Sequence, residues 1–231
     1  MTLAIFACGF AGHGKDTICD VIEQFLNERN KSYTRESFAG RIKLLVSSLV
    51  KFHDSNDTYN QKNKKVNLHM SFESISETEE IFYQIGLDMA CSYDKFISMF
   101  KTQFGFMRTR TGYVSKSIAP RKLYQFIGDD IGRNMINDQH WAKIIPITEP
   151  IIIISDLRRV SELTNIRKRV SKTIVFRAHS DVRPLPEMHD SEKEVLSLPY
   201  DELIINNGTL SEFREKVRCQ FEKHYVANCY V

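Results

Sequence analysis

The chain has 231 residues, of which 42% are hydrophobic and 26% are charged, and its formal net charge is +3. This composition fits one globular domain with a full core and room for an inserted subdomain. The near balance of charge predicts no stable nucleic-acid partner, and no apolar run approaches the roughly 18 residues that cross a bilayer. Five cysteines without a Cys-x-x-Cys pair indicate reduced thiols in a cytoplasmic protein rather than disulfides or a zinc site.

The first fifth of the chain alternates strand and helix patterns. Residues 3–8 form an apolar run without a basic flank, which predicts a buried first strand rather than a signal peptide. Glycines separate this run from a helix at about 15–28, whose apolar residues recur at helical spacing. A short strand at 32–38 and a second helix at 40–49 are expected next.

The middle of the chain departs from this alternation. Residues 52–75 are polar and predict a loop or the edge of an insertion, and a helical pattern resumes at about 76–101. A basic, glycine-containing loop is expected at 105–119, before Pro120 begins a long helix. We therefore predict an inserted, mostly helical substrate-binding or lid region at about 52–119 within a single domain.

The last third returns to strands and helices. Strands are predicted at 150–154, 173–177 and 203–205, and a helix is predicted at 158–170. Thr209 and Glu212 have the spacing of a capping box at the start of a final helix. Strands that alternate with helices in this way predict an α/β fold with three layers and a central parallel sheet.

The stretch GFAGHGKDT after the first strand has the residues of a phosphate-binding loop. Gly9, Gly12 and Gly14 let backbone N–H groups converge on oxyanions at a helix N-terminus, and Lys15 reaches the outer phosphates. The alternative is a tight glycine turn in which Asp16 only complements the helix dipole. The position between the first strand and the first helix favours the phosphate-binding loop.

Asp16 stands where such a loop normally carries the serine or threonine that ligates Mg²⁺. A carboxylate also binds a hard cation, and Thr17 offers a hydroxyl one residue further on. The sequence leaves open which of the two serves the metal.

The predicted strand at 150–154 leads into Asp156, Arg158 and Arg159. No base-reading Asn-Lys-x-Asp segment of a GTPase is present, and the acid is not followed by the glutamate that is usual in motor ATPases. An acid followed by arginines at a strand end favours phosphoryl transfer to a second phosphorylated substrate. Asp156 is then the expected Mg²⁺ carboxylate, with a helix N-cap as the alternative.

Several short motifs together resemble the deoxynucleoside monophosphate kinases of tailed bacteriophages, within the wider nucleoside monophosphate kinase group. The motifs that carry the resemblance are Gly14-Lys15-Asp16-Thr17, Phe38-Ala39-Gly40-Arg41-Ile42-Lys43, Arg121 to Gly128, Trp141, Asp156-Leu157-Arg158 with Glu162, His189 with Glu192, and Ile204 to Leu210. The resemblance implies a P-loop kinase domain over 1–231 that moves the γ-phosphoryl of ATP to a deoxynucleoside 5′-monophosphate with Mg²⁺. It also implies the cytoplasm of an infected cell and a homodimer.

The resemblance also implies roles for individual site residues. The expected ATP-binding residues are Gly9, Gly12, His13, Gly14, Lys15, Asp16, Thr17 and Arg183. The expected catalytic residues are Lys15, Asp156 and Arg158, and the metal side falls to Asp16, Thr17 and Asp156. The expected substrate-binding residues are Lys43, Arg121, Gln125, Arg133 and Trp141.

Alternatives stay open for several of these residues. Lys43 is equally well explained as a solvated lysine, and Arg121 with Gln125 as one solvated helix face. Trp141 is also expected as core or pocket wall, and the sequence does not choose between Arg177 and Arg183 as the arginine over ATP. His189 and Glu192 predict a helix-start motif rather than catalytic groups.

Two other functions remain as rivals. One is a related small-molecule kinase of the dephospho-coenzyme A or phosphomevalonate type. The other is a non-catalytic nucleotide- or DNA-binding protein whose basic loop at 108–121 contacts phosphate backbones, with binding that weakens steeply in salt.

Overall fold

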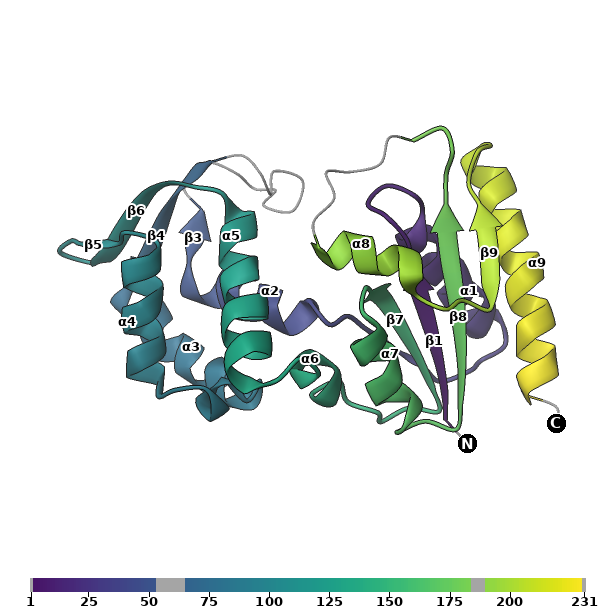
Figure 1. Cartoon of the computed structure of the whole chain (residues 1–231), viewed down its shortest axis with the longest axis horizontal. Helices are drawn as coiled ribbons and strands as arrows, with labels where there is room; N and C mark the ends of the chain where they lie inside the picture. Colours follow the sequence, from purple (N-terminus) through teal and green to yellow (C-terminus); the bar gives the residue numbers. More distant parts are fainter. Residues whose placement is uncertain (1, 53–64, 184–189, 230–231) are drawn as a thin grey trace. The chain divides into compact units, whose positions relative to one another are not determined.

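The computed structural model describes residues 2–52, 65–183 and 190–229 and divides into two compact units (Figure 1). The first unit joins Met1–Phe38 to Ile145–Val231, and the second is the continuous segment Ala39–Ile144. The predicted insertion at about 52–119 lies inside this second segment, which is wider at both ends. Its role as a substrate-binding or lid region stays a prediction.

The first unit contains a five-stranded parallel sheet. Its strands are β1 (Leu3–Cys8), β2 (Thr34–Glu36), β7 (Ile151–Leu157), β8 (Lys172–His179) and β9 (Glu202–Ile205). They lie in the order β2-β7-β1-β8-β9, and every neighbouring pair is parallel. The predicted α/β fold with a central parallel sheet is therefore confirmed.

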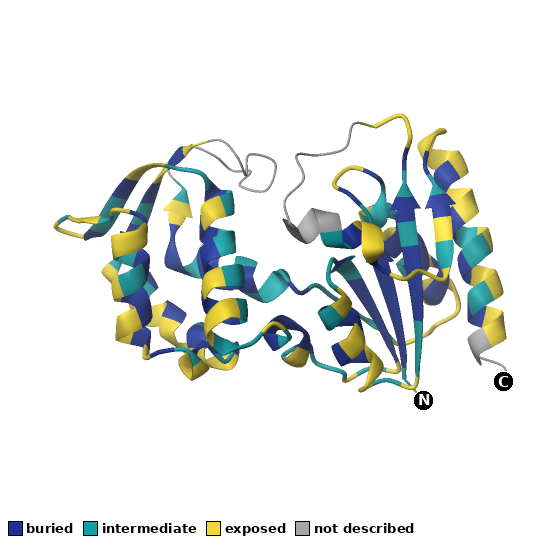
Figure 2. Cartoon of the chain, in the orientation of Figure 1, coloured by how far each residue is buried: buried dark blue, intermediate teal, exposed yellow. Residues whose placement is uncertain are grey.

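Helices cover both faces of this sheet (Figure 1). Helices α1 (Lys15–Glu28) and α9 (Leu210–Cys229) pack on one face, where their apolar side chains form one core cluster with alternate residues of β1, β7 and β8. Helices α7 (Val160–Arg167) and α8 (Asp190–Ser197) lie over the other face. The central strands are consequently buried along most of their length (Figure 2), which explains their continuous apolar sequence.

Most element limits in this unit agree with the sequence patterns. Strand β2 is shorter than the predicted 32–38, because only three of its residues pair with β7. Strand β7 runs three residues beyond the apolar run, so that Asp156 belongs to the strand itself. The capping box is confirmed: Glu212 accepts from the backbone N–H of Thr209 at 2.7 Å, and Thr209 Oγ1 accepts from that of Glu212 at 3.3 Å.

The second unit combines helices with a four-stranded sheet. Its strands are β3 (Lys51–Phe52), β4 (Val66–Ser71), β5 (Met107–Arg108) and β6 (Gly112–Ile118), in the antiparallel order β3-β4-β6-β5. Its helices are α2 (Gly40–Leu49), α3 (Phe72–Gln84), the short 3₁₀ helix η1 (Leu87–Met89), α4 (Tyr93–Gln103), α5 (Pro120–Gln125), the π-helix η2 (Phe126–Ile136) and α6 (His140–Lys143).

The structure corrects four predictions in this unit. Strand β4 lies within the segment predicted as a polar loop, and β5 with β6 form a hairpin where a basic loop was expected. The predicted helix at 76–101 is two helices, because Gly86 with φ 70° ends the first and Ser92 caps the second by accepting from the N–H of Lys95. The long helix after Pro120 continues as a π-helix.

Aromatic side chains form the core of the second unit. Phe82, Phe96, Phe100, Phe104 and Phe126 follow one another with ring centroids 5.0–6.1 Å apart. All five are buried. The unit therefore has a hydrophobic core of its own.

Two further observations bear on the expectations from composition. Cys8, Cys19, Cys91 and Cys219 are free thiols. None of the helices in the described part of the chain combines the length and apolar surface that crossing a bilayer requires.

Candidate nucleotide-binding site

The loop between β1 and α1 has the backbone of a phosphate-binding loop. Gly9, Gly12 and Gly14 have φ values of 136°, 80° and 110°, which side-chain-bearing residues rarely adopt. A Cβ on Gly14 would lie 2.7 Å from the ring of Phe213 and 2.8 Å from the side-chain nitrogen of Asn206. No side chain caps α1, so the N–H groups of its first turn stay open to an anion.

A backbone N–H after β8 and a side chain after β9 hold this loop in place. The imidazole of His13 is fully buried, and its Nδ1 accepts from the backbone N–H of Ser180 at 3.1 Å. The carboxamide of Asn206 donates to the His13 carbonyl oxygen at 3.0 Å. The side chain of His13, which was predicted to bind ATP, is thus directed into the protein and shapes the loop instead.

Lys15 is the first residue of α1, with its side chain only 13% exposed. Its ammonium nitrogen lies 3.9 Å from a carboxylate oxygen of Asp16, whose side chain is 63% exposed. Thr17 is half-buried on the same turn. The predicted lysine, carboxylate and hydroxyl therefore all lie at the N-terminus of one helix.

Asp156 lies at the carboxyl end of β7, the strand that pairs with β1. Its Oδ1 accepts from the backbone N–H of Phe38 at 2.8 Å, across from the end of β2. The carboxyl ends of parallel strands share one edge of the sheet, so Asp156 and the glycine loop belong to the same edge. The N-cap alternative is wrong, because α7 begins four residues later with Arg159 as its N-cap.

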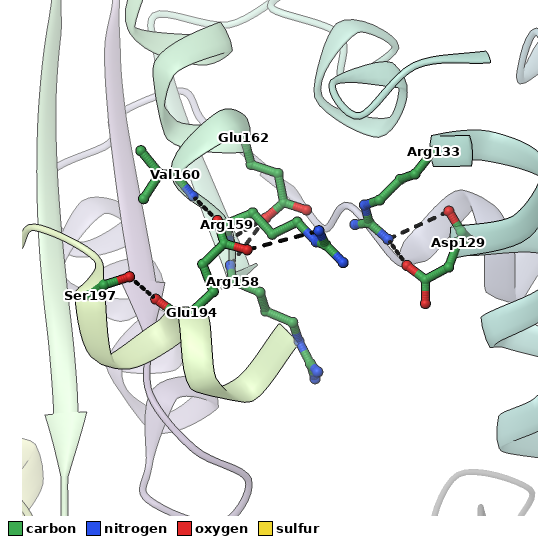
Figure 3. A network of polar contacts seen from close by, with 9 residues as sticks. Asp129, Arg133, Arg158, Arg159, Val160, Glu162, Glu194 and Ser197 are labelled. Atoms are coloured by element: carbon green, nitrogen blue, oxygen red, sulfur yellow. Dashed lines mark hydrogen bonds and ion pairs between the residues drawn. The ribbon is translucent and has the colours of Figure 1, made fainter. Parts of the chain in front are cut away.

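Arg158 and Arg159 occupy the turn between β7 and α7 (Figure 3). The buried carboxylate of Glu162 accepts from both of their backbone N–H groups at 3.1 Å. Within the described part of the chain, the guanidinium of Arg158 has no hydrogen bond or ion pair. This leaves a half-buried cation at the site edge that is available to an anion.

The structure separates the two arginines that the sequence left undecided. The guanidinium of Arg183 donates to the carbonyl oxygen of Gly12 in the glycine loop. Arg177 instead donates to the carbonyl oxygens of Val195 at 2.6 Å and Leu198 at 2.7 Å, at the end of α8. Arg183 is therefore the arginine at the predicted ATP site, and Arg177 is structural.

The predicted substrate residues lie in the second unit, on neighbouring helices. Arg121 and Gln125 are four residues apart on α5, both half-buried, and so share one helix face. Lys43 lies in the second turn of α2, which packs against η2: a Cβ on Gly128 would lie 3.0 Å from Cδ1 of Ile42. These three side chains keep their predicted role as candidates for a monophosphate and its base.

Two of the predicted substrate residues are engaged within the second unit. The indole of Trp141 is 1% exposed, and its N–H donates to the carbonyl oxygen of Gly128 at 2.8 Å, so Trp141 is a core residue and its prediction as a substrate contact is corrected. Arg133 forms an ion pair with Asp129 at 2.7 Å, one turn away on η2 (Figure 3). This pair weakens the case for Arg133 as an anion ligand.

Other predicted positions lie outside the described residues. His189 is one of them, and the side chain of Glu192 is another. Among the described residues, no group of three or more histidine, cysteine, aspartate or glutamate side chains is arranged to hold a metal ion.

A parallel sheet, a glycine loop at the end of its central strand, and a lysine on the following helix define a P-loop α/β protein. The model of one family, described as deoxynucleotide monophosphate kinase, matches residues 4–217. The chain belongs to the deoxynucleotide monophosphate kinase family.

Other comparisons add no functional argument. No curated protein matches the chain. One solved structure, described as "In situ structure of BmCPV RNA dependent RNA polymerase at quiescent state", aligns with 12% sequence identity and a TM-score of 0.30. The alignment covers 95% of this chain and only 38% of that one, and a similarity this low supports no inference.

Sequence reasoning missed two residues that shape the site. Asn206 lies in the segment Ile204 to Leu210, which carries the resemblance without a predicted role for Asn206, and its signal is a polar residue directly after a short apolar strand. Glu194 accepts from the backbone N–H of Val160, 34 residues away. Nothing in the local sequence of Glu194 indicates that contact.

Proposed function

We propose that this kinase transfers the γ-phosphoryl group of ATP to a deoxynucleoside 5′-monophosphate, giving ADP and a deoxynucleoside diphosphate. The observation that carries the proposal is the glycine loop with Lys15 at the open N-terminus of α1, beside Asp156 and Arg158, in a chain of this family. An acceptor phosphate oxygen is already charged and needs no strong general base. The residues of the site suit such an acceptor, because the site is rich in cations and N–H donors that stabilise phosphate charge.

Each candidate site residue of the first unit then has a distinct role in the reaction. The loop N–H groups and Lys15 bind the β- and γ-phosphates, and Arg183 binds ATP from the loop after β8. Arg158 neutralises charge on the transferred group as an acceptor phosphate oxygen attacks phosphorus and the bridging oxygen leaves with ADP. Alignment and charge neutralisation together lower the barrier.

The donor set of the first unit suits Mg²⁺. This ion prefers oxygen ligands and is usually held by one or two carboxylates together with substrate phosphates, so a closed cage of protein ligands is not needed. Asp156 would hold it directly or through water, with Asp16 or Thr17 on the loop side. When bound, the ion neutralises phosphate charge.

For the acceptor nucleotide, we propose Arg121 and Lys43 as phosphate ligands and Gln125 as a base-edge contact. A guanidinium pairs with phosphate oxygens, and a carboxamide carries both a donor and an acceptor for a base. The two cationic side chains, on α5 and α2, and the carboxamide on α5 support the proposal.

The decisive experiment measures ADP release by the purified protein with Mg-ATP and a panel of acceptors. We expect turnover with one or more deoxynucleoside monophosphates and none with dephospho-coenzyme A or phosphomevalonate. Lys15→Ala should reduce kcat by about a hundredfold to a thousandfold, the usual effect of losing one donor to a developing charge. Lys31→Ala, an exposed lysine just after α1, is the control.

Turnover of the unrelated acceptors alone would favour a small-molecule kinase. Absence of any turnover, with salt-sensitive binding to nucleic acid, would favour the non-catalytic alternative.

The resemblance to bacteriophage kinases further supports a phage-encoded enzyme of the host cytoplasm that acts as a homodimer. Sedimentation of the purified protein tests the dimer.

A further inference from the structure

Helix α8 contributes one carboxylate to the turn that carries the two arginines (Figure 3). Oε1 of Glu194 accepts from the backbone N–H of Val160 at 3.0 Å, and Oε2 lies 3.8 Å from the guanidinium of Arg159. The first N–H groups of a helix have no partner within the helix. Glu194 therefore supplies from outside what a local capping residue normally supplies.

A second carboxylate fixes the same turn from within α7. Glu162 accepts from the backbone N–H groups of Arg158 and Arg159, so three successive N–H groups are bound by two glutamates. The backbone at Arg158 is consequently held, although its guanidinium has no partner in the described part of the chain. A side chain whose backbone is held in place and whose guanidinium has no protein partner is well suited to bind an anion.

The position of Glu194 is itself well determined. The neighbouring Val195 and Leu198 are buried, and Arg177 on β8 donates to the carbonyl oxygens of both. The hydroxyl of Ser197 donates to the carbonyl oxygen of Glu194 at 2.9 Å. These contacts attach α8 to the sheet, so Glu194 transmits the position of the sheet and α8 to the arginine turn.

We propose that Glu194 is a positioning residue for phosphoryl transfer. It holds the turn that aims Arg158 and engages the neighbouring Arg159, so that Arg158 is the arginine presented to the phosphates. The proposal rests on the proposed function of Arg158. It assigns a task to α8 in the arrangement of the site.

Two substitutions separate the contacts of Glu194. Glu194→Ala removes both, and we expect kcat to fall by about tenfold to a hundredfold, the scale of a small misplacement of a catalytic group, with the KM for ATP changed by less than about threefold. Glu194→Gln keeps an oxygen that accepts from Val160, so it should recover most of the lost kcat. The control Glu215→Ala removes an exposed glutamate of α9 and should leave both constants unchanged.

A double-mutant cycle distinguishes positioning from simple stabilisation. If Glu194 acts through Arg158, Glu194→Ala should cause almost no further loss of kcat in an Arg158→Ala background. An equal loss in both backgrounds would overturn the proposal. So would a Glu194→Ala variant that unfolds at lower temperature but retains wild-type kcat per folded molecule.

The same four proteins separate failure of this proposal from failure of the proposed function. If the wild type turns over no deoxynucleoside monophosphate, the proposed function is wrong. The cycle is then read from the affinity for ATP and for inorganic pyrophosphate, measured by calorimetry. Non-additive losses of anion affinity would support positioning of Arg158 by Glu194, and additive losses would refute it.

Discussion

Gly14 and Gly12 belong to the same loop and both have a positive φ, but their surroundings differ. A Cβ on Gly14 would meet the ring of Phe213 and the carboxamide of Asn206, whereas a Cβ on Gly12 would meet only the guanidinium of Arg183, at the ordinary contact distance of 3.6 Å. We expect Gly14→Ala to lower the free energy of unfolding by about 2 to 4 kcal/mol, from backbone strain and overpacking. Gly12→Ala should lower the free energy of unfolding by about 1 to 2 kcal/mol, from backbone strain alone.

Chemical denaturation followed by circular dichroism measures both values. Equal losses for the two variants would show that Phe213 and Asn206 move aside, and that the loop is not held by the last helix. The comparison is internal, because both substitutions add the same methyl group to the same loop.

We expect the free energy of unfolding to depend on pH because of His140. Burial lowers the pKa of His140, and its Nε2 lies 2.9 Å from the carbonyl oxygen of Ile85, to which the neutral ring donates. The unfolded chain therefore binds the proton more readily than the folded one. Stability from this group is complete above the ordinary histidine pKa of about 6.5 and is lost as the pH falls through the lowered folded value.

The measurement is the urea midpoint as a function of pH. His140→Gln retains an N–H donor for Ile85 but does not titrate, so its midpoint should change less than that of the wild type just below pH 6.5. The pKa values of Glu28 and Glu212 are lowered by hydrogen bonds from Arg218 and from the Thr209 backbone N–H, so their contribution is lost only below their ordinary value of 4.5. Parallel profiles would rule out His140 as the source.

Single residues were predictable where the chemistry is local. The glycine loop, Lys15 and Arg158 follow from residue types next to one strand, and the structure places them at the sheet edge where they were expected. The inward orientation of His13 was not predictable, because it depends on Ser180, which lies far along the chain. For Trp141 the sequence left both a substrate contact and a core position open, and burial of the indole with its N–H bonded to Gly128 decides for the core. Sequence identifies the candidates, and packing decides which of them face the site.

At the scale of elements, η2 offers a test of packing within a π-helix. A Cβ on Gly132 would lie 2.5–2.6 Å from three atoms of the Trp141 indole. Alanine ordinarily stabilises a helix relative to glycine by about 1 kcal/mol, but overpacking of this kind costs about 1 to 3 kcal/mol. We expect Gly132→Ala to lower the free energy of unfolding by about 1 to 2 kcal/mol.

Trp141→Phe provides the matched background, because it removes the ring atoms that Gly132 approaches. In that background Gly132→Ala should be neutral or stabilising, as measured by a double-mutant cycle in urea. A constant cost in both backgrounds would show that the wider helical turn itself, and not the indole, requires glycine.

Strand β4, which the sequence patterns did not predict, depends on a distant partner. Strand β4 pairs with β6, more than forty residues further along the chain, so its hydrogen bonds have no local signature. Its alternation of Val66, Leu68 and Met70 is visible in the sequence, but the polar cluster before it dominates the pattern. Helices α1 and α2 were predicted to the residue because their apolar spacing is a local property.

At the scale of the whole chain, the division into two units was only partly predictable. The sequence has no glycine- or proline-rich linker at the boundaries, and the chain passes between the units after Phe38 and before Ile145. Both crossings follow or precede buried residues, so composition does not reveal them. The second unit, Ala39–Ile144, contains the segment 52–119 that the sequence predicts as an insertion and extends beyond it at both ends.

The continuity of the second unit leads to a prediction about autonomous folding. Residues 39–144 contain a complete four-stranded sheet and the aromatic core from Phe82 to Phe126. We expect a fragment of these residues to fold alone and unfold in one cooperative thermal transition, since a domain of about 100 residues can bury a sufficient core. Circular dichroism measures the transition, and the dispersion of the amide resonances shows whether the fragment is folded.

As the control, Phe100→Ala in the core should abolish the transition or lower its midpoint strongly, because emptying a buried aromatic site costs about 3 to 5 kcal/mol. A fragment without dispersed resonances would show that this core requires the remainder of the chain in order to form.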